Sequence, residues 1–295
     1  MTLIPEIAEE ISRATGSRFQ PLRRSLVNGG CINRAEIIES RGERYFLKLN
    51  QPGCLEMFAA EAAGLRELGQ ASAIRVPAPV CWGVADGHSY LVLEYLALGR
   101  GDAGTAEELG RGLAQLHQVR GERFGWHRDN TIGTTPQINM PSEDWGDFWG
   151  RQRLGFQLQL AARNGYRGAL QRDGERLLAA LPALLDGHRP QPSLLHGDLW
   201  GGNYAADQNG KPVIFDPAVY FGDREADLAM TELFGGFPAA FYEAYRERLP
   251  LDSGYPIRKD LYNLYHILNH LNLFGGGYQA QAERMLASLL RTTGT

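Results

Sequence analysis

Two carboxylates and one carboxamide in the C-terminal half of the chain have the residue types and spacing that phosphoryl transfer requires. Asp198 precedes Asn203 by five residues within the run HGDLWGGN, and Asp216 follows the apolar run PVIF, thirteen residues after Asn203. Transfer of a phosphoryl group depends more on positioning and charge neutralisation than on covalent chemistry. We expect Asp198 to accept the proton of an attacking hydroxyl, and the hard oxygen atoms of Asn203 and Asp216 to bind Mg²⁺.

A lysine in the N-terminal half supplies positive charge that could meet the phosphates of ATP. Lys48 lies in the strand-like run YFLKL, where an unpaired ammonium group beside a core would be costly. Glu61 lies thirteen residues further on, in a helical segment, and could pair with it. Such a pair would hold the lysine against the α- and β-phosphates. Glu56 and Glu67 lie in the same segment and are alternative partners.

The segment NGGCIN at residues 28–33 separates two strand-like runs and predicts a hairpin whose backbone can approach a ligand closely. Gly29 and Gly30 would offer backbone N–H groups to phosphate oxygens. Cys31 in the same loop is expected to be accessible, and nearby N–H groups favour its thiolate. We therefore expect oxidation of Cys31 to switch activity off, including through a redox-dependent dimer; the alternative is an inert small residue.

Hydrophobic periodicity divides the chain into a strand-rich first third and a helical remainder. Residues 1–16 predict a short amphipathic helix, and residues 55–68 predict a helix that lies between groups of strands. The expected fold class is α+β with two lobes. A nucleotide-binding lobe at 1–95 would carry a small antiparallel sheet and one helix on it. A larger, mostly helical catalytic and substrate lobe would occupy 96–295.

The second lobe is expected to contain helices on both sides of a strand–loop–strand unit at 193–216. Thr105 and Glu108 have the spacing of a capping box at the start of its first helix. A long helix is expected at 145–164, with its aromatic side chains in the core. Further helices are expected at 168–185, 227–233, 241–248, 257–274 and 279–291.

Composition excludes several classes of function. The chain has 295 residues, a net charge of -4 and no run of five basic residues, so it is not built to coat nucleic acid or an anionic membrane. Three cysteines without a Cys-x-x-Cys pair argue against a disulfide framework and a zinc site. We find no signal peptide and no 18-residue apolar run, and we therefore expect a cytoplasmic protein.

Six separated motifs resemble those of the fructosamine/ketosamine 3-kinases, a family with the aminoglycoside-phosphotransferase-like, protein-kinase-like fold. They are NGGCIN (28–33), FLKLN (46–50), HGDLWGGN (196–203), FDPA (215–218), FGGFP (234–238) and LNHLNLFG (268–275). The resemblance runs from about residue 20 to about residue 290, and EAAGL at 61–65 favours Glu61 as the partner of Lys48. The glycine loop lacks the Gly-x-Gly-x-x-Gly pattern of protein kinases, which disfavours a protein kinase.

The resemblance implies an ATP-dependent kinase for the 3-hydroxyl of ketosamines, the sugar adducts that glycation leaves on amines. A phosphate at C3 lies β to the C2 carbonyl and can leave, so the activity would be deglycation, or protein repair. Fructosamines, ribulosamines and erythrulosamines, free or protein-bound, stay open as substrates. The backbone of Glu94 and Leu96 would meet adenine, and the resemblance would place Trp200 beside the sugar, with core packing as the alternative. His270 lies with His266 and Asn269 on the helix expected at 257–274. We expect it to line the substrate cleft; a metal pair and plain packing are the alternatives.

Two alternative functions belong to the same fold. One is another small-molecule kinase, for aminoglycosides, choline or a related metabolite. The other is a pseudokinase that acts as a binding protein. A pseudokinase would be expected to lack at least one of four residues, all of which are present here: Lys48, Asp198, Asn203 and Asp216. Three further polar residues are expected to be structural. His196 would fix the backbone of its own loop, with a catalytic histidine as the alternative; Asp227 would tie that loop or cap its helix; and Asp223 is expected to be structural as well.

Overall fold

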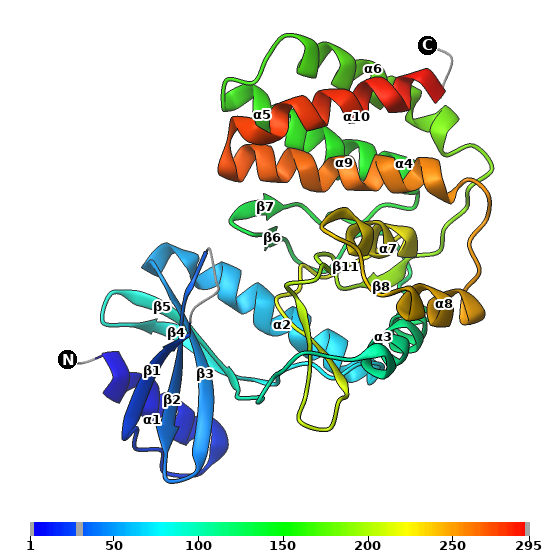
Figure 1. Cartoon of the computed structure of the whole chain (residues 1–295). Coiled ribbons are helices and arrows are strands. Elements are labelled where there is room, and N and C mark those ends of the chain that lie inside the picture. Colours follow the sequence, from blue (N-terminus) through cyan, green and yellow to red (C-terminus); the bar gives the residue numbers. More distant parts are fainter. Residues whose placement is uncertain (1–2, 28–31, 293–295) are drawn as a thin grey trace.

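The computed structural model describes residues 3–27 and 32–292, which form a small sheet-containing lobe and a larger helical lobe (Figure 1). The small lobe holds a five-stranded antiparallel sheet in the order β1-β2-β3-β5-β4. Its elements are α1 (Leu3–Thr15), β1 (Arg23–Val27), β2 (Arg34–Ser40), β3 (Glu43–Asn50), the short 3-10 helix η1 (Pro52–Cys54), α2 (Leu55–Ala71), β4 (Pro79–Ala85) and β5 (His88–Glu94). The expected α+β class is confirmed.

Alternation along β5 assigns the two faces of the sheet to different partners. Tyr90 and Val92 belong to an apolar cluster with α1, whereas Leu91 and Leu93 belong to a cluster with α2. Side chains of directly opposed residues on neighbouring strands lie on the same face of a sheet. Lys48 of β3 is opposite Leu91, so its side chain lies on the α2 face.

The large lobe consists of helices packed around short two-stranded antiparallel pairs (Figure 1). Its helices are α3 (Ala103–Leu116), α4 (Trp145–Phe148), the π-helix η2 (Trp149–Gly155), α5 (Phe156–Arg163), α6 (Ala169–Leu184), α7 (Arg224–Leu233), α8 (Ala239–Arg248), α9 (Tyr255–Phe274), the 3-10 helix η3 (Gly276–Tyr278) and α10 (Gln279–Thr292). Its strands pair as β6 (Asn130–Ile132) with β7 (Thr135–Gln137), β8 (Ser193–Leu195) with β11 (Tyr220–Gly222), and β9 (Tyr204–Ala206) with β10 (Pro212–Ile214).

The start of α3 differs from the sequence expectation. Asp102 is the N-cap and accepts a hydrogen bond from the Thr105 N–H (2.9 Å), while the Thr105 hydroxyl accepts from the Asp102 N–H (3.2 Å). The capping box is therefore Asp102–Thr105, and the expected Thr105–Glu108 box is wrong. Thr105 is held in this place because its hydroxyl donates to the carbonyl of Gly210 (2.8 Å), and Glu108 instead pairs with Lys211 (2.6 Å).

The helix expected at 145–164 is continuous but contains a π-helical segment between α4 and α5. Trp145, Phe148 and Trp149 are buried in the core, as expected, whereas Phe156, the fourth aromatic residue expected there, is only half-buried. Arg153 of the π-helix is also fully buried, and its guanidinium lies 4.2 Å from the centre of the Tyr220 ring. The sequence patterns did not predict β6, β7 or β11, which are three residues long each.

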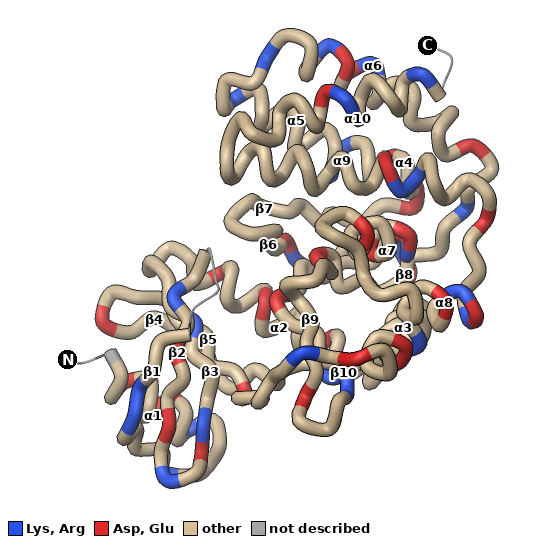
Figure 2. The backbone as a smooth tube through the Cα atoms, viewed as in Figure 1, with Lys and Arg blue, Asp and Glu red and all other residues tan. Residues whose placement is uncertain are grey.

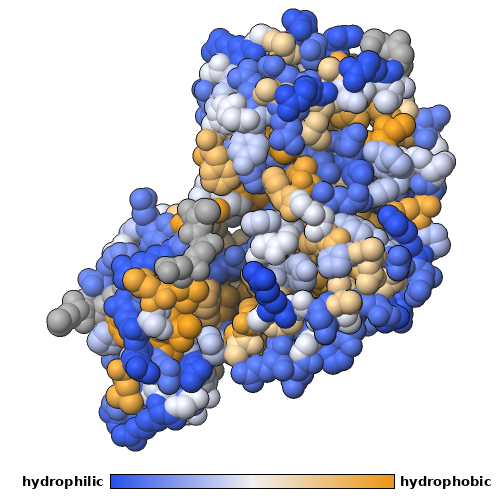
Figure 3. All heavy atoms as spheres, viewed as in Figure 1, coloured by the Kyte–Doolittle hydropathy of each residue, from blue (hydrophilic) through white to orange (hydrophobic). Residues whose placement is uncertain are grey.

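Neither positive nor negative charge dominates the part of the chain that the structure describes. Both signs are spread over both lobes in Figure 2, in keeping with the small net charge. Figure 3 shows hydrophobic side chains gathered on the small lobe. Leu22 and Leu26, at the first strand of that lobe, are 71% and 66% exposed. Among the helices that the structure describes, none has the length and apolar character needed to cross a bilayer.

Candidate active site

The HGD loop (residues 196–203) joins β8 to β9, and a buried carboxylate on α7 holds its start. Asp227 accepts hydrogen bonds from the backbone N–H groups of His196 (2.7 Å) and Gly197 (2.8 Å). The buried His196 ring accepts from the Asp198 N–H at Nδ1 (3.3 Å) and donates from Nε2 to the carbonyl of Phe215 (3.0 Å). The expected structural roles of His196 and Asp227 are confirmed.

Gly197 has to be glycine for two reasons. Its φ is +83°, in the left-handed region that favours glycine, and an added Cβ would lie 2.0 Å from the carbonyl oxygen of Ala218. That close approach lets the Ala218 N–H donate to the carbonyl of His196 (2.8 Å). The loop is thus packed directly against the segment that follows Asp216.

His117 of α3 completes the support of the HGD loop. Its Nε2 lies 3.2 Å from Asp227 Oδ2, and its Nδ1 lies 2.8 Å from the hydroxyl of Tyr245. Burial lowers the pKa of His117, so the neutral ring donates from Nε2. Burial alone would raise the pKa of Asp227, but the hydrogen bonds it accepts from His117 and the loop lower it below its ordinary value. Sequence reasoning missed His117, because 110 residues separate it from its partner.

Asp198 and Asn203 face each other across the loop. The side-chain amide of Asn203 donates to the Asp198 carbonyl (2.7 Å) and to its carboxylate (3.1 Å). Among the described residues, nothing donates a hydrogen bond to the Oδ1 atom of Asn203, so that oxygen is available as a ligand for a metal ion. Burial, together with the charge of Asp216, raises the pKa of Asp198 well above its ordinary value.

Lys48 links the small lobe to the end of β10. Its Nζ lies 2.5 Å from Glu61 Oε1 on α2 and donates a second hydrogen bond to Asp216 Oδ1. Burial lowers the pKa of Lys48, but the charges of Asp216 and Glu61 outweigh that effect and raise it above its ordinary value. The structure therefore brings Lys48, Glu61 and Asp216 together, and Glu56 and Glu67 make other contacts.

Asp216 has the backbone conformation of a strained position. Its φ is +57°, which is uncommon for a residue other than glycine and is found at functional sites. Its side chain is 49% exposed. Asp198, Asn203 and Asp216 together present carboxylate and amide oxygens, and the two carboxylates repel each other. This donor set fits a hard divalent cation such as Mg²⁺.

A row of aromatic rings begins at the HGD loop. Trp200 is 38% exposed, and its ring lies 6.0 Å from the Phe234 ring. The Phe234 ring in turn lies 4.8 Å from the His270 ring. Phe274 and Tyr278 continue the row at 5.4 and 5.2 Å from His270. We call these five residues the aromatic row. The structure thus connects Trp200 and His270 through the ring of Phe234, which lies between them.

The remaining expected nucleotide contacts are only partly described. Glu94 ends β5, its N–H donates to the carbonyl of Ala78 (2.8 Å), and its carboxylate pairs with Arg75. Among described residues, the Leu96 N–H makes no hydrogen bond. Gly29, Gly30 and Cys31 lie outside the described residues, so the expectations for them stay predictions.

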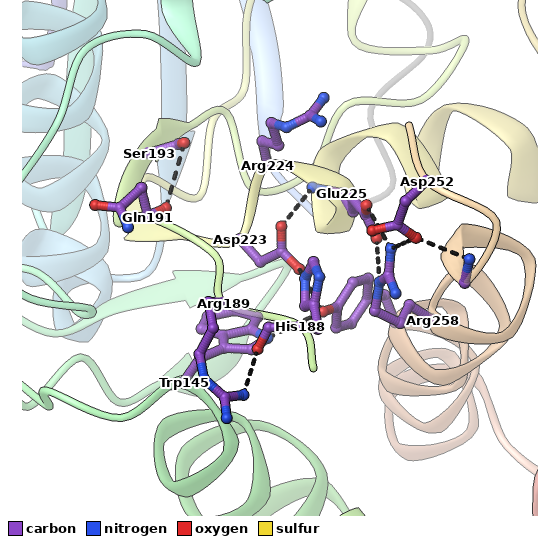
Figure 4. Close-up of polar contacts among 12 residues, drawn as sticks. Trp145, His188, Arg189, Gln191, Ser193, Asp223, Arg224, Glu225, Asp252 and Arg258 are labelled. Atoms are coloured by element: carbon purple, nitrogen blue, oxygen red, sulfur yellow. Dashed lines mark hydrogen bonds and ion pairs between the residues drawn. The ribbon is translucent and has the colours of Figure 1, made fainter. Parts of the chain in front are cut away.

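A second polar network fixes the start of α7 (Figure 4). Asp223 caps the helix and contacts His188 Nε2 (2.6 Å) and the Tyr262 hydroxyl (2.5 Å). Arg258 donates to both oxygens of Glu225 (2.6 and 2.9 Å) and to Asp252 (2.6 Å). The network holds α7, and therefore Asp227, in place, and the structural role expected for Asp223 is confirmed.

The same network contains three side chains with the spacing of a metal site. His188, Glu225 and Asp252 offer ligand atoms within 4.8 Å of one another. Both carboxylates, however, already bind the guanidinium of Arg258. The positive charge between them is therefore supplied by the arginine.

Comparison with known proteins identifies the family. A family model described as fructosamine kinase matches residues 3–292. The chain belongs to the fructosamine kinase family. A probable ketoamine kinase of Synechocystis sp. is 52% identical over 286 residues, which are 97% of this chain and 96% of the relative. The chloroplastic protein-ribulosamine 3-kinase of Arabidopsis thaliana is 43% identical, over 94% of this chain and 85% of that protein.

Solved structures give the same family and the wider fold. A Haemophilus somnus structure described as a fructosamine-3-kinase has a TM-score of 0.90 and 30% identity, with 98% of each chain covered. The aminoglycoside phosphotransferase APH(4)-Ia, in a complex with ADP and hygromycin B, has a TM-score of 0.65 at 16% identity, which shows the fold alone. The expected two-lobed kinase-like fold and the resemblance to fructosamine/ketosamine kinases are both confirmed.

Proposed function

We propose that this fructosamine kinase family member transfers the γ-phosphate of ATP to the 3-hydroxyl of a ketosamine. The observation that carries the proposal is the meeting of Lys48, Glu61 and Asp216 beside the facing pair Asp198 and Asn203. Phosphoryl transfer needs these parts: a cation for the phosphates, oxygen ligands for Mg²⁺ and a carboxylate for the acceptor hydroxyl. The names of the relatives support a ketosamine as the acceptor.

Asp198 would orient the acceptor and take its proton. The hydroxyl oxygen forms a bond to the γ-phosphorus while the bond from that phosphorus to the β–γ bridging oxygen breaks, and ADP leaves. The hydroxyl proton passes to the carboxylate of Asp198. Burial raises the pKa of this carboxylate, which makes it a better proton acceptor than an exposed aspartate.

The other residues would bind the nucleotide. Asn203 and Asp216 would hold Mg²⁺, which when bound neutralises charge on the phosphate oxygens. Lys48 would hold the α- and β-phosphates, and Glu61 would keep the lysine in place. The backbone N–H groups of Gly29 and Gly30 would cover the phosphates, and the backbone of Glu94 and Leu96 would meet adenine.

The aromatic row would receive the acceptor. Ketosamines carry a protonated amine, and an aromatic face attracts such a cation, so Trp200 would contact the amine end of the substrate. His270, two rings along the row, would lie beside the sugar. Phosphorylation at C3 places a leaving group β to the C2 carbonyl, and the adduct can then release the amine.

The test is ADP release from Mg-ATP with ribulosyl-lysine, fructosyl-lysine or an erythrulosyl amine as the acceptor. Kanamycin and choline serve as comparators. Asp198→Asn is the matched control, because it keeps the side-chain shape and cannot take the proton. Turnover on a ketosamine that is lost in this variant supports the proposal. Turnover on a comparator alone would contradict the assignment of a ketosamine as the substrate. Binding of ATP without any turnover would favour a pseudokinase.

Two finer expectations belong with this proposal. A redox-dependent dimer through Cys31 predicts that dithiothreitol raises activity in the wild type but not in Cys31→Ala. Equal redox responses in the two proteins would contradict it. A cytoplasmic location is likewise a proposal, and fractionation of the source cells would test it.

A further inference from the structure

Helix α2 carries Glu61, yet it is attached to the large lobe along its whole length. It runs from the sheet across to the large lobe in Figure 1. Near its start, Arg128 donates to Glu56 Oε2 (2.9 Å) and to the carbonyl of Ala59 (3.4 Å). Past its end, Ile74 packs on α3 so closely that a Cβ at Gly112 would lie 2.6 Å from its side chain.

The second half of α2 contacts both Trp126 and the segment that follows Asp216. The indole N–H of Trp126 donates to Glu67 Oε2 (3.2 Å), and Trp126 is only 5% exposed. On the neighbouring helix turn, a Cβ at Gly64 would lie 3.0 Å from the side chain of Val219, three residues after Asp216. The helix therefore lies close to the Asp216 segment, where a Cβ at position 64 would require the Val219 side chain to shift slightly.

Helix geometry makes these contacts a constraint on rotation. Glu56 and Glu67 are eleven residues apart, about three turns and about 16 Å along the axis, so they lie on the same side of the helix. Glu61 is rotated by about 120° from Glu67 around the axis. A rotation or shift that withdrew Glu61 from Lys48 would break the contacts of Glu56 and Glu67 together.

We propose that Trp126 and Arg128 are positioning residues: their hydrogen bonds to Glu67 and Glu56 fix the orientation of α2 and so keep Glu61 in contact with Lys48. The two contacts differ in strength. Glu56 is 84% exposed, and exposed ion pairs contribute little, so the Trp126–Glu67 hydrogen bond is the main one. The inference rests on the proposed kinase chemistry, in which the Lys48–Glu61 pair holds nucleotide phosphates.

The test compares variants that separate the hydrogen bond from the packing. Trp126→Phe keeps an aromatic ring but has no N–H, Glu67→Leu removes the acceptor, and Glu67→Gln keeps one. The first two should weaken MgADP binding, measured by titration calorimetry, and lower kcat/KM for ATP, each by about fivefold, the scale of one hydrogen bond. Glu67→Gln should stay within twofold of the wild type. Arg123→Ala is the control, because its partner Glu143 lies in the same lobe segment and outside α2.

A double-mutant cycle distinguishes positioning from general stability. In a Glu61→Gln background, Trp126→Phe should have no further effect on MgADP affinity, because its effect passes through Glu61. Additive effects, or wild-type affinity in Trp126→Phe with its fold intact by circular dichroism, would overturn the inference. The binding readout needs no acceptor. A protein without ketosamine turnover that still shows the non-additive cycle would therefore refute the proposed function and leave this inference standing.

Discussion

Asp227 offers the sharpest test of how the active site is supported. Its buried carboxylate accepts from the N–H groups of His196 and Gly197 and from the His117 ring. Asparagine has the same shape, but only one of its two terminal atoms can accept a hydrogen bond. In Asp227→Asn at least one of the donors would face an NH₂ group.

The expected loss follows from these contacts. A hydrogen bond to a charged group contributes about 1.5–3 kcal/mol, and a buried donor left without a partner costs about 1–3 kcal/mol. Asp227→Asn should therefore lower the free energy of unfolding by about 3–5 kcal/mol at pH 7. In a chain of this size that corresponds to a fall in Tm of roughly 10 °C. Because the HGD loop loses its anchor, kcat should fall more than the KM for ATP rises.

The assay is urea unfolding of both proteins across pH, with initial rates measured at pH 7. The pKa of Asp227 is lowered in the folded state, so its contribution is complete above the unfolded pKa of about 4 and declines as pH falls through the folded pKa. The difference between wild type and variant should accordingly shrink below about pH 4. Asp207→Asn is the control, since the partners of that half-buried aspartate are the nearby residues of its own turn. Equal stability of wild type and Asp227→Asn at pH 7 would refute the reasoning.

Three further perturbations have defined outcomes. Gly110→Ala would place a Cβ 2.2 Å from the carbonyl oxygen of Phe241, so it should lower the free energy of unfolding by about 1–3 kcal/mol in the same urea assay. Gly53→Ala is its control and should change little, because there is open space around Gly53. Trp200→Ala should raise the KM for a ketosamine about tenfold and leave the KM for ATP unchanged, because it removes an aromatic contact made only by the acceptor. A parallel rise in both constants would contradict this. Chelation by EDTA should abolish turnover, and added Mg²⁺ should restore it while Ca²⁺ should not, since the two ions differ in size and coordination.

The parts of the site that sequence could predict are those in which local spacing sets geometry. Asp198 and Asn203 share one loop, and a lysine within the apolar run of β3 predicts an acidic partner for Lys48, although the choice of Glu61 over its neighbours followed only from the family resemblance. The expected place of Trp200 beside the sugar comes from the family resemblance, whereas His270 is singled out by its spacing from His266 on one helix. Phe234, the ring that connects them, was not anticipated as part of a row.

Sequence could not predict features decided by partners far along the chain. Two overlapping capping patterns compete at the start of α3, and the bond from Thr105 to Gly210, 105 residues away, selects the earlier one. His117 lies at the end of an amphipathic helix and resembles any other core residue until Asp227 is placed beside it. The three-residue strands are too short for a periodic signal, and packing alone defines them.

The apolar cluster shared by α2, β5 and α3 has a consequence for how the molecule comes apart. Leu65, Leu93 and Leu109 belong to one continuous core, although they lie on both sides of the connection between the lobes. Heating should therefore melt both lobes in one cooperative transition, with equal calorimetric and van't Hoff enthalpies. A nick between β5 and α3 would leave two fragments that each expose part of the shared core, and they should regain structure only when mixed.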